Sequence, residues 1–160
     1  MLKKLINWYW NIRYPELSTE QVNKVFDQFD SIQEFASFLK AAGFKWSSDG
    51  LNFCQATDTF ERPGQVLARR FANCGGYMRL FKEFCLYKGF YDYLAEYELT
   101  DGVIRNRWHY ISVIVHNGKI FSQSNMDILE FPTDDHIVDF WRMRYRKMTL
   151  IREHRKEIGG

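Results

Sequence analysis

The chain has 160 residues and a formal net charge of +2, with 18% aromatic residues and only three prolines. This length predicts a single domain over residues 1–160 with a sizeable core, and the low proline content argues against long disordered tails. The near-neutral charge gives no general indication of nucleic-acid binding, and the absence of any apolar run of about 18 residues excludes a transmembrane helix.

The cysteine content and the N-terminus predict a reduced, soluble protein. Cys54, Cys74 and Cys85 form an odd set without a C-x-x-C pair, which is a poor fit to a disulfide framework or a thiolate zinc site. We therefore expect no metal and no cofactor. Residues 1–15 lack the apolar run and cleavage site of a secretory signal, so we expect a cytoplasmic location and no membrane contact. The size and composition would also suit a viral or phage protein, located in a virion.

The first part of the chain has the spacing of short amphipathic helices. An aromatic-rich helix is predicted over residues 2–12. Ser18 followed by Gln21, and Ser31 followed by Glu34, are capping boxes that open two further helices. We expect these two helices to be antiparallel.

The rest of the chain changes from helices to strands and back to a helix. Pro63 opens one helix and Cys74 opens the next, which Gly89 ends. The period then falls from helical spacing to strict alternation, which predicts strands on both sides of an Asn117-Gly118 turn. A final helix, rich in basic residues, is predicted over 134–157. Helices, an antiparallel sheet and a helix in this order predict the α+β class.

Cys74 is a candidate nucleophile because of its place at the start of a helix. Unsatisfied N–H groups at a helix N-terminus favour the thiolate and lower the pKa of a cysteine. Gly75 and Gly76 remove side chains beside the sulfur, which would let a substrate backbone approach. The alternative is a buried cysteine at a tight turn, and we expect this core role for Cys85.

His109 is the candidate base for Cys74. It lies on a predicted strand where it shares a face with Ile111, and it would suit a base if that face packs on the cysteine helix. A general base needs an orienting partner. Counting back from the hairpin turn brings Asn125 or Ser124 opposite His109, and we prefer Asn125 because an amide oxygen can accept from the ring. The alternative is a core histidine with its hydrogen bonds satisfied.

Two segments carry a resemblance to a known family. NCGGYMRLFKEFCLYKG and RWHYISVIVHNGKIFSQSN resemble the cysteine helix and histidine strand of the transglutaminase-like cysteine proteinases. The resemblance covers about 44–126, within a catalytic-like core of about 44–131. It implies a papain-like fold, with the N-terminal helices and the cysteine helix packed on a small antiparallel sheet. It also implies hydrolysis of peptide or amide bonds, or acyl transfer, through a thioester, with Cys74 as nucleophile and His109 as base.

The sequence departs from the family pattern around both residues. Ala72-Asn73 stands before the cysteine where Gly-Asp is common, and Ser124-Asn125 stands where an aspartate is usual; Asp127 is a further candidate for this third member. The oxyanion hole would use the N–H of Cys74 and a side chain such as Gln65 or Gln55. We therefore predict a Cys-His-Asn type site for a peptide or protein substrate, with an inactive relative as the competing hypothesis.

The basic C-terminal segment supports a second class of function. Between residues 142 and 156 the chain carries seven Lys or Arg residues and one acidic residue, Glu153. Such a run is ordinarily a solvated helix face, but it can also dock an acidic protein or a nucleic acid. The alternative function is thus a catalytically inactive binding or assembly module.

Overall fold

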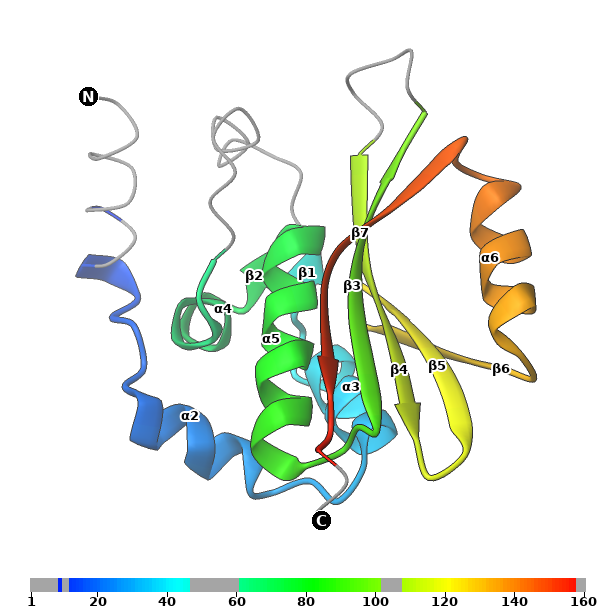
Figure 1. Cartoon of the computed structure of the whole chain (residues 1–160). Coiled ribbons are helices and arrows are strands. Elements are labelled where there is room, and N and C mark those ends of the chain that lie inside the picture. Colours follow the sequence, from blue (N-terminus) through cyan, green and yellow to red (C-terminus); the bar gives the residue numbers. More distant parts are fainter. Residues whose placement is uncertain (1–8, 10–11, 47–60, 102–107, 158–160) are drawn as a thin grey trace.

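The computed structural model describes residues 9, 12–46, 61–101 and 108–157 (Figure 1). Most of the predicted helix over 2–12 lies outside the described residues. The helices are α2 (Thr19–Phe26), α3 (Ile32–Ala41), α4 (Pro63–Arg69), α5 (Cys74–Lys88) and α6 (Asp134–Arg142). The strands are β1 (Lys45–Trp46), β2 (Phe71–Ala72), β3 (Tyr93–Thr100), β4 (Trp108–His116), β5 (Lys119–Ser124), β6 (Asp127–Phe131) and β7 (Lys147–Arg155).

The main sheet has the order β6-β5-β4-β3-β7, and every neighbouring pair is antiparallel. Helix α5 lies against one face and α6 against the other (Figure 1). Strands β4 and β5 join through Asn117 and Gly118, whose φ angles of 51° and 73° fit the predicted two-residue hairpin. Helices combined with an antiparallel sheet confirm the α+β class.

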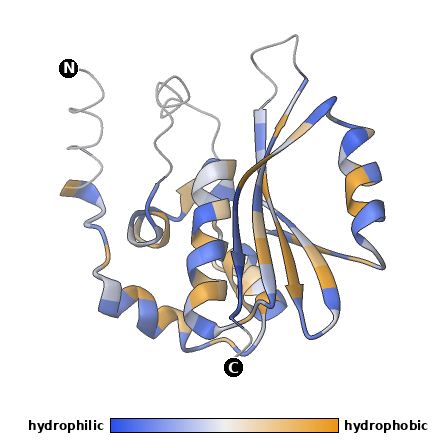
Figure 2. Ribbon diagram, in the orientation of Figure 1, coloured by the Kyte–Doolittle hydropathy of each residue, from blue (hydrophilic) through white to orange (hydrophobic). Residues whose placement is uncertain are grey.

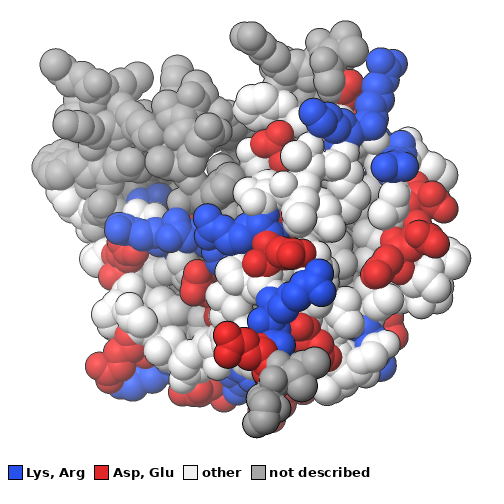
Figure 3. Space-filling view, in the orientation of Figure 1, with Lys and Arg blue, Asp and Glu red and all other residues white. Residues whose placement is uncertain are grey.

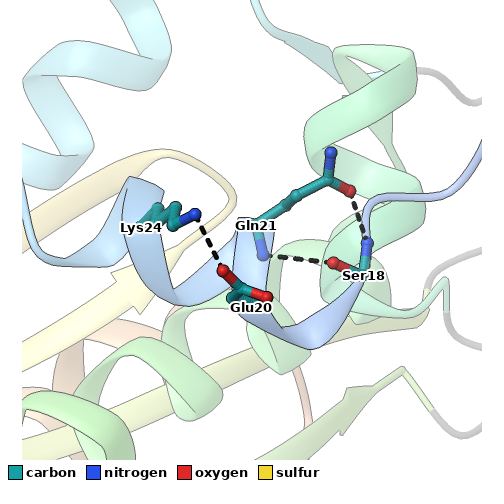
Figure 4. A network of polar contacts seen from close by, with 4 residues as sticks. All are labelled: Ser18, Glu20, Gln21 and Lys24. Carbon is teal, nitrogen blue, oxygen red and sulfur yellow. Dashed lines mark hydrogen bonds and ion pairs between the residues drawn. The ribbon is translucent and has the colours of Figure 1, made fainter.

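The helix caps follow the local sequence signals closely. Ser18 Oγ accepts the N–H of Gln21 at 3.3 Å, and Gln21 Oε1 accepts the N–H of Ser18 at 2.9 Å, which is a complete capping box (Figure 4). At α3, Ser31 Oγ accepts the N–H of Glu34 at 3.1 Å. The Glu34 carboxylate, however, accepts the backbone N–H of Asp30 and not that of Ser31. Both helix starts are therefore as predicted, although the second box is only half formed.

The core is divided between the two faces of the sheet, and apolar residues run along α5 and the central strands (Figure 2). On one face, α5 packs on Leu94 and Ile114 of the sheet together with the aromatic residues of α2 and α3. On the other face, Ile111 and Val113 of β4 pack under Trp141 of α6. The antiparallel sheet is thus covered on both sides.

The C-terminal segment differs from the prediction of one basic helix over 134–157. Helix α6 begins at Asp134 as expected but ends at Arg142, and Lys147–Arg155 forms β7, which pairs with β3. Strand β3 would otherwise have an unpaired edge, and its backbone groups gain hydrogen bonds from β7 that a helix could not give. None of the helices among the described residues is long and apolar enough to span a bilayer.

Two tyrosines on α5 allow the stability contribution of a hydrogen bond from a buried hydroxyl to be compared with that of one at the surface. The Tyr77 hydroxyl donates to the Lys45 carbonyl at 2.8 Å with its side chain fully buried, whereas the Tyr87 hydroxyl donates to Asp27 at 2.9 Å on the surface. We expect Tyr77→Phe to lower the free energy of unfolding by about 1–2 kcal/mol, because the hydrogen bond from the buried Tyr77 hydroxyl to the Lys45 carbonyl is lost. Tyr87→Phe should stay within about 0.5 kcal/mol of wild type in the same denaturant titration. Equal effects of the two variants would contradict this view.

Candidate active site

The N-terminus of α5 is fixed by a cap and by a short strand. Asn73 has an extended backbone, and its Oδ1 accepts the N–H of Gly76 at 2.9 Å. The preceding β2 pairs in parallel with β1, and the Lys45 N–H donates to the Arg70 carbonyl at 3.0 Å. The chain therefore enters the helix in one defined direction, and Cys74 is its first residue as predicted.

The thiol of Cys74 is not activated at rest. Burial raises its pKa, and the negative charge of Glu61 raises it further. The backbone N–H groups of Tyr110, Gly75 and Cys74 itself act in the opposite direction but do not compensate. The expectation that the helix N-terminus lowers the pKa of Cys74 is therefore wrong in its net sign, because the loss of hydration outweighs the helix dipole.

The two glycines after Cys74 do not open a path for substrate. Gly75 and Gly76 are both buried. A Cβ at position 76 would lie 2.5 Å from Glu61 Oε2 and 2.9 Å from the Cβ of Ala72. The missing side chain thus makes room for a carboxylate. Glu61 was not predicted as a site residue, and no local sequence signal marks it.

His109 lies at the beginning of β4 in a partly buried aromatic setting. Its Nε2 is 2.8 Å from Ser124 Oγ. Its ring lies 5.7 Å from that of Trp141 and stacks on that of Tyr145 at 6.0 Å. Burial lowers the pKa of His109 to about 4, so the imidazole is neutral at pH 7.

The sequence predicts that α5 packs on the face of the sheet that carries the His109 ring, and the structure differs. The face of the sheet that carries His109 and Ile111 is covered by α6, whereas α5 packs on the opposite face. The sulfur of Cys74 instead meets the N–H of Tyr110, which belongs to the peptide unit that links Tyr110 to His109. The thiol therefore lies beside the backbone of His109, not opposite its ring within one face.

Among the candidates for the third member, Ser124 is the one hydrogen-bonded to His109. Asn125 has a left-handed backbone (φ 52°), and its carbonyl accepts from Gln123 Nε2 at 2.6 Å. Its Oδ1 is buried without a hydrogen-bond partner among the described residues. Asp127 pairs with Lys40 at 2.5 Å, away from the ring.

The remaining predicted residues are not brought to the thiol. Gln65 Oε1 accepts the N–H of Arg62 at 2.9 Å and so caps α4. Cys85 is fully buried in the core, as expected. Gln55 and Cys54 lie outside the described residues. Within the described part of the chain, no group of three or more His, Cys, Asp or Glu residues could hold a metal ion.

The low pKa of His109 predicts a specific dependence of stability on pH. The unfolded chain titrates this histidine near pH 6.5 and the folded chain near 4. Between these values the unfolded state binds the extra proton, so the free energy of unfolding should fall as the pH is lowered through this window, by about 2–3 kcal/mol from His109.

A comparison of two histidine variants measures this contribution. In His109→Gln, the decrease in the free energy of unfolding between pH 6.5 and 4 should be smaller than in the wild type by about 2–3 kcal/mol, as measured by denaturant titrations at each pH. His136→Gln is the control, because His136 lies exposed on α6, where its Nδ1 is 2.6 Å from Thr133 Oγ1. If His109→Gln keeps the wild-type slope, the histidine is not buried in its neutral form.

Comparison with known proteins places the fold. No family model matches the sequence, and no curated protein sequence matches it. The structure of calcium-bound LapG from Legionella pneumophila is similar, with 11% identity, a TM-score of 0.51, and coverage of 88% of this chain and 86% of that chain.

Two further structures of Legionella pneumophila LapG are also similar. One covers 73% of this chain and 77% of that chain. The other, EGTA-treated, covers 72% and 76%. Each is 12% identical with a TM-score of 0.46. The chain therefore shares the α+β fold of calcium-bound LapG.

Proposed function

We propose that this protein is a thiol-dependent hydrolase or acyltransferase that acts on peptide or amide bonds through Cys74, His109 and Ser124. The observation that carries the proposal is that the start of α5, with Cys74, lies beside the start of β4, with His109. The Cys74 sulfur lies at the peptide unit that follows His109, while Ser124 holds the far nitrogen of the same histidine. The fold shared with LapG, a transglutaminase-like cysteine protease, is consistent with this chemistry.

In the proposed reaction the two ring nitrogens of His109 have different roles. Nδ1 is the ring nitrogen closer to its own backbone, where the sulfur lies, and Nε2 is engaged by Ser124. In the proposed reaction Nδ1 accepts the thiol proton as the sulfur attacks the carbonyl carbon, and Nε2–H donates to Ser124 Oγ. The resulting oxyanion accepts from the Cys74 N–H.

The remaining steps return the proton and free the enzyme. The imidazolium gives its proton to the leaving amine as the carbon–nitrogen bond breaks, which leaves a thioester on Cys74. Water then hydrolyses the thioester, or an acceptor amine takes the acyl group. His109 accepts the proton of the incoming nucleophile, and the thiol is restored.

Ser124 is the preferred third member because it already contacts the ring. A hydroxyl can fix the orientation of the ring, but it adds no negative charge to stabilise an imidazolium. The lowered pKa of His109 agrees with a neutral partner. We therefore propose a Cys-His-Ser site in place of the Cys-His-Asn site expected from the sequence.

The second candidate function is an inactive binding module, and the neutral state of both residues favours it. A thiol with a raised pKa beside an unprotonated histidine is a weak nucleophile at rest. The basic residues between 142 and 156 would then bind an acidic protein or a nucleic acid, in a salt-dependent manner that survives Cys74→Ala. On the face shown in Figure 3, however, basic side chains are interspersed with acidic ones instead of forming one field.

Replacing the nucleophile separates these two functions. In the wild type we expect an iodoacetamide probe to label Cys74 and not the buried Cys85, as read by mass spectrometry of the peptides. Cys74→Ala should abolish that labelling and all turnover in a peptide-library assay, while His109→Ala should reduce turnover about 100-fold or more. Turnover that persists in folded Cys74→Ala would refute the thiol mechanism.

A matched pair of variants tests the third member. Ser124→Ala removes the hydroxyl that contacts Nε2 of His109, and we expect kcat/KM to fall about tenfold or more. Asn125→Gly removes the neighbouring amide while tolerating the left-handed backbone at this position, and it should leave kcat/KM within about threefold of wild type. The reverse order of effects would restore Asn125 as the orienting residue.

A further inference from the structure

The carboxylate of Glu61 is placed against the N-terminus of α5, on the turn that carries Cys74. Its Oε2 occupies the space that a side chain at Gly76 would need, 2.5 Å from the ideal Cβ position. This oxygen is buried and has no hydrogen-bond partner within the described part of the chain. A buried carboxylate oxygen without a hydrogen bond is costly to a fold, so its position calls for a functional reason.

The groups around this carboxylate only partly compensate its charge. Burial raises the pKa of Glu61, while Arg69 of α4 and the backbone N–H groups of Glu61 and Asn73 favour its charged form. The charge in turn raises the pKa values of Cys74 and Tyr77 on α5. Among the described residues, Arg69 is thus the cation, and Cys74 and Tyr77 are the ionisable groups, whose charges interact with that of Glu61.

The location of this charge opposes the field of the helix. The first turn of a helix carries a partial positive charge that stabilises an anion, which would ordinarily be the Cys74 thiolate. The carboxylate of Glu61, packed against this turn, already occupies the region of positive charge. A second anion beside it, the Cys74 thiolate, is therefore disfavoured. The two groups therefore compete for the positive end of α5.

We propose that Glu61 is a positioning residue of this site, which keeps the Cys74 thiol protonated at rest, and that Gly76 makes the room it needs. The thiolate then forms during attack, as His109 takes the proton, and does not stand exposed to oxidants and other electrophiles between turnovers. This inference rests on the proposed function in taking Cys74 as the nucleophile and His109 as its base.

The test is the pH profile of Cys74 alkylation, followed residue by residue with mass spectrometry. Glu61→Gln keeps the shape of the side chain and removes its charge. We expect the midpoint of the profile to move to lower pH and the alkylation rate at pH 7 to rise by about twofold or more. Glu83→Gln removes an exposed charge from the same helix, beside Lys82, and should leave the profile unchanged.

A second variant keeps the inference open to refutation if Glu61→Gln does not fold. Gly76→Ala would place a Cβ in contact with Glu61 Oε2 and push the carboxylate aside, so it should move the profile in the same direction. An unchanged or upward-shifted midpoint in whichever variant folds, checked by circular dichroism, overturns the inference. Alkylation requires no catalytic turnover. The effect of Glu61 on the Cys74 thiol can therefore be measured even if the protein proves not to be a hydrolase or acyltransferase.

Discussion

The burial of α5 between the sheet and the other helices is the constraint on which the rest of the structure depends. Its middle is fixed by Lys82, which lies 3.7 Å from Glu96 of β3 although both residues are less than 9% exposed. A buried ion pair adds little net stability, but it disfavours a shift of the helix along the strand, because separating two buried charges is costly. Glu83, 3.7 Å from Lys82, and His154, 4.0 Å from Glu96, are further partners of the two charges. Together with the Tyr77 hydrogen bond to β1, the Lys82–Glu96 pair contributes to the placement of α5, whose first residue is Cys74.

The same burial decides the chemistry of the thiol. A helix N-terminus stabilises a nearby anion by about 0.3–1 kcal/mol at an exposed site, or about 2 kcal/mol when partly buried. Removing a charged group from water can shift a pKa by several units, with each unit worth about 1.4 kcal/mol. At Cys74 the second effect is larger, because the sulfur is enclosed by α5, Tyr110 and Glu61. A cysteine at a helix start is therefore not activated by its location alone.

The helix caps and the hairpin turn could be predicted because they depend on residues close together in the sequence. The features that were not predicted depend on contacts between residues far apart in the sequence. Ser18 with Gln21, and the Asn117-Gly118 turn, act within a few residues, so the sequence shows them directly. The strand Lys147–Arg155 forms because β3 has an open edge, which no window around it reveals. Glu61 enters the site through a contact with Gly76, 15 positions later, and the sheet face that α5 covers is likewise a tertiary property.

The distribution of charge around the two candidate residues then limits the mechanism. The resemblance implies an Asp or Asn facing the histidine, but here a neutral hydroxyl faces His109 and the carboxylate lies next to the thiol. Both differences favour the uncharged pair, since an imidazolium lacks a counter-charge and a thiolate is repelled. A standing thiolate–imidazolium pair is thus disfavoured, so the proposed reaction requires proton transfer to accompany bond formation. A pKa of about 4 keeps His109 unprotonated throughout the physiological range, and it also makes the ring a weaker base than an exposed imidazole.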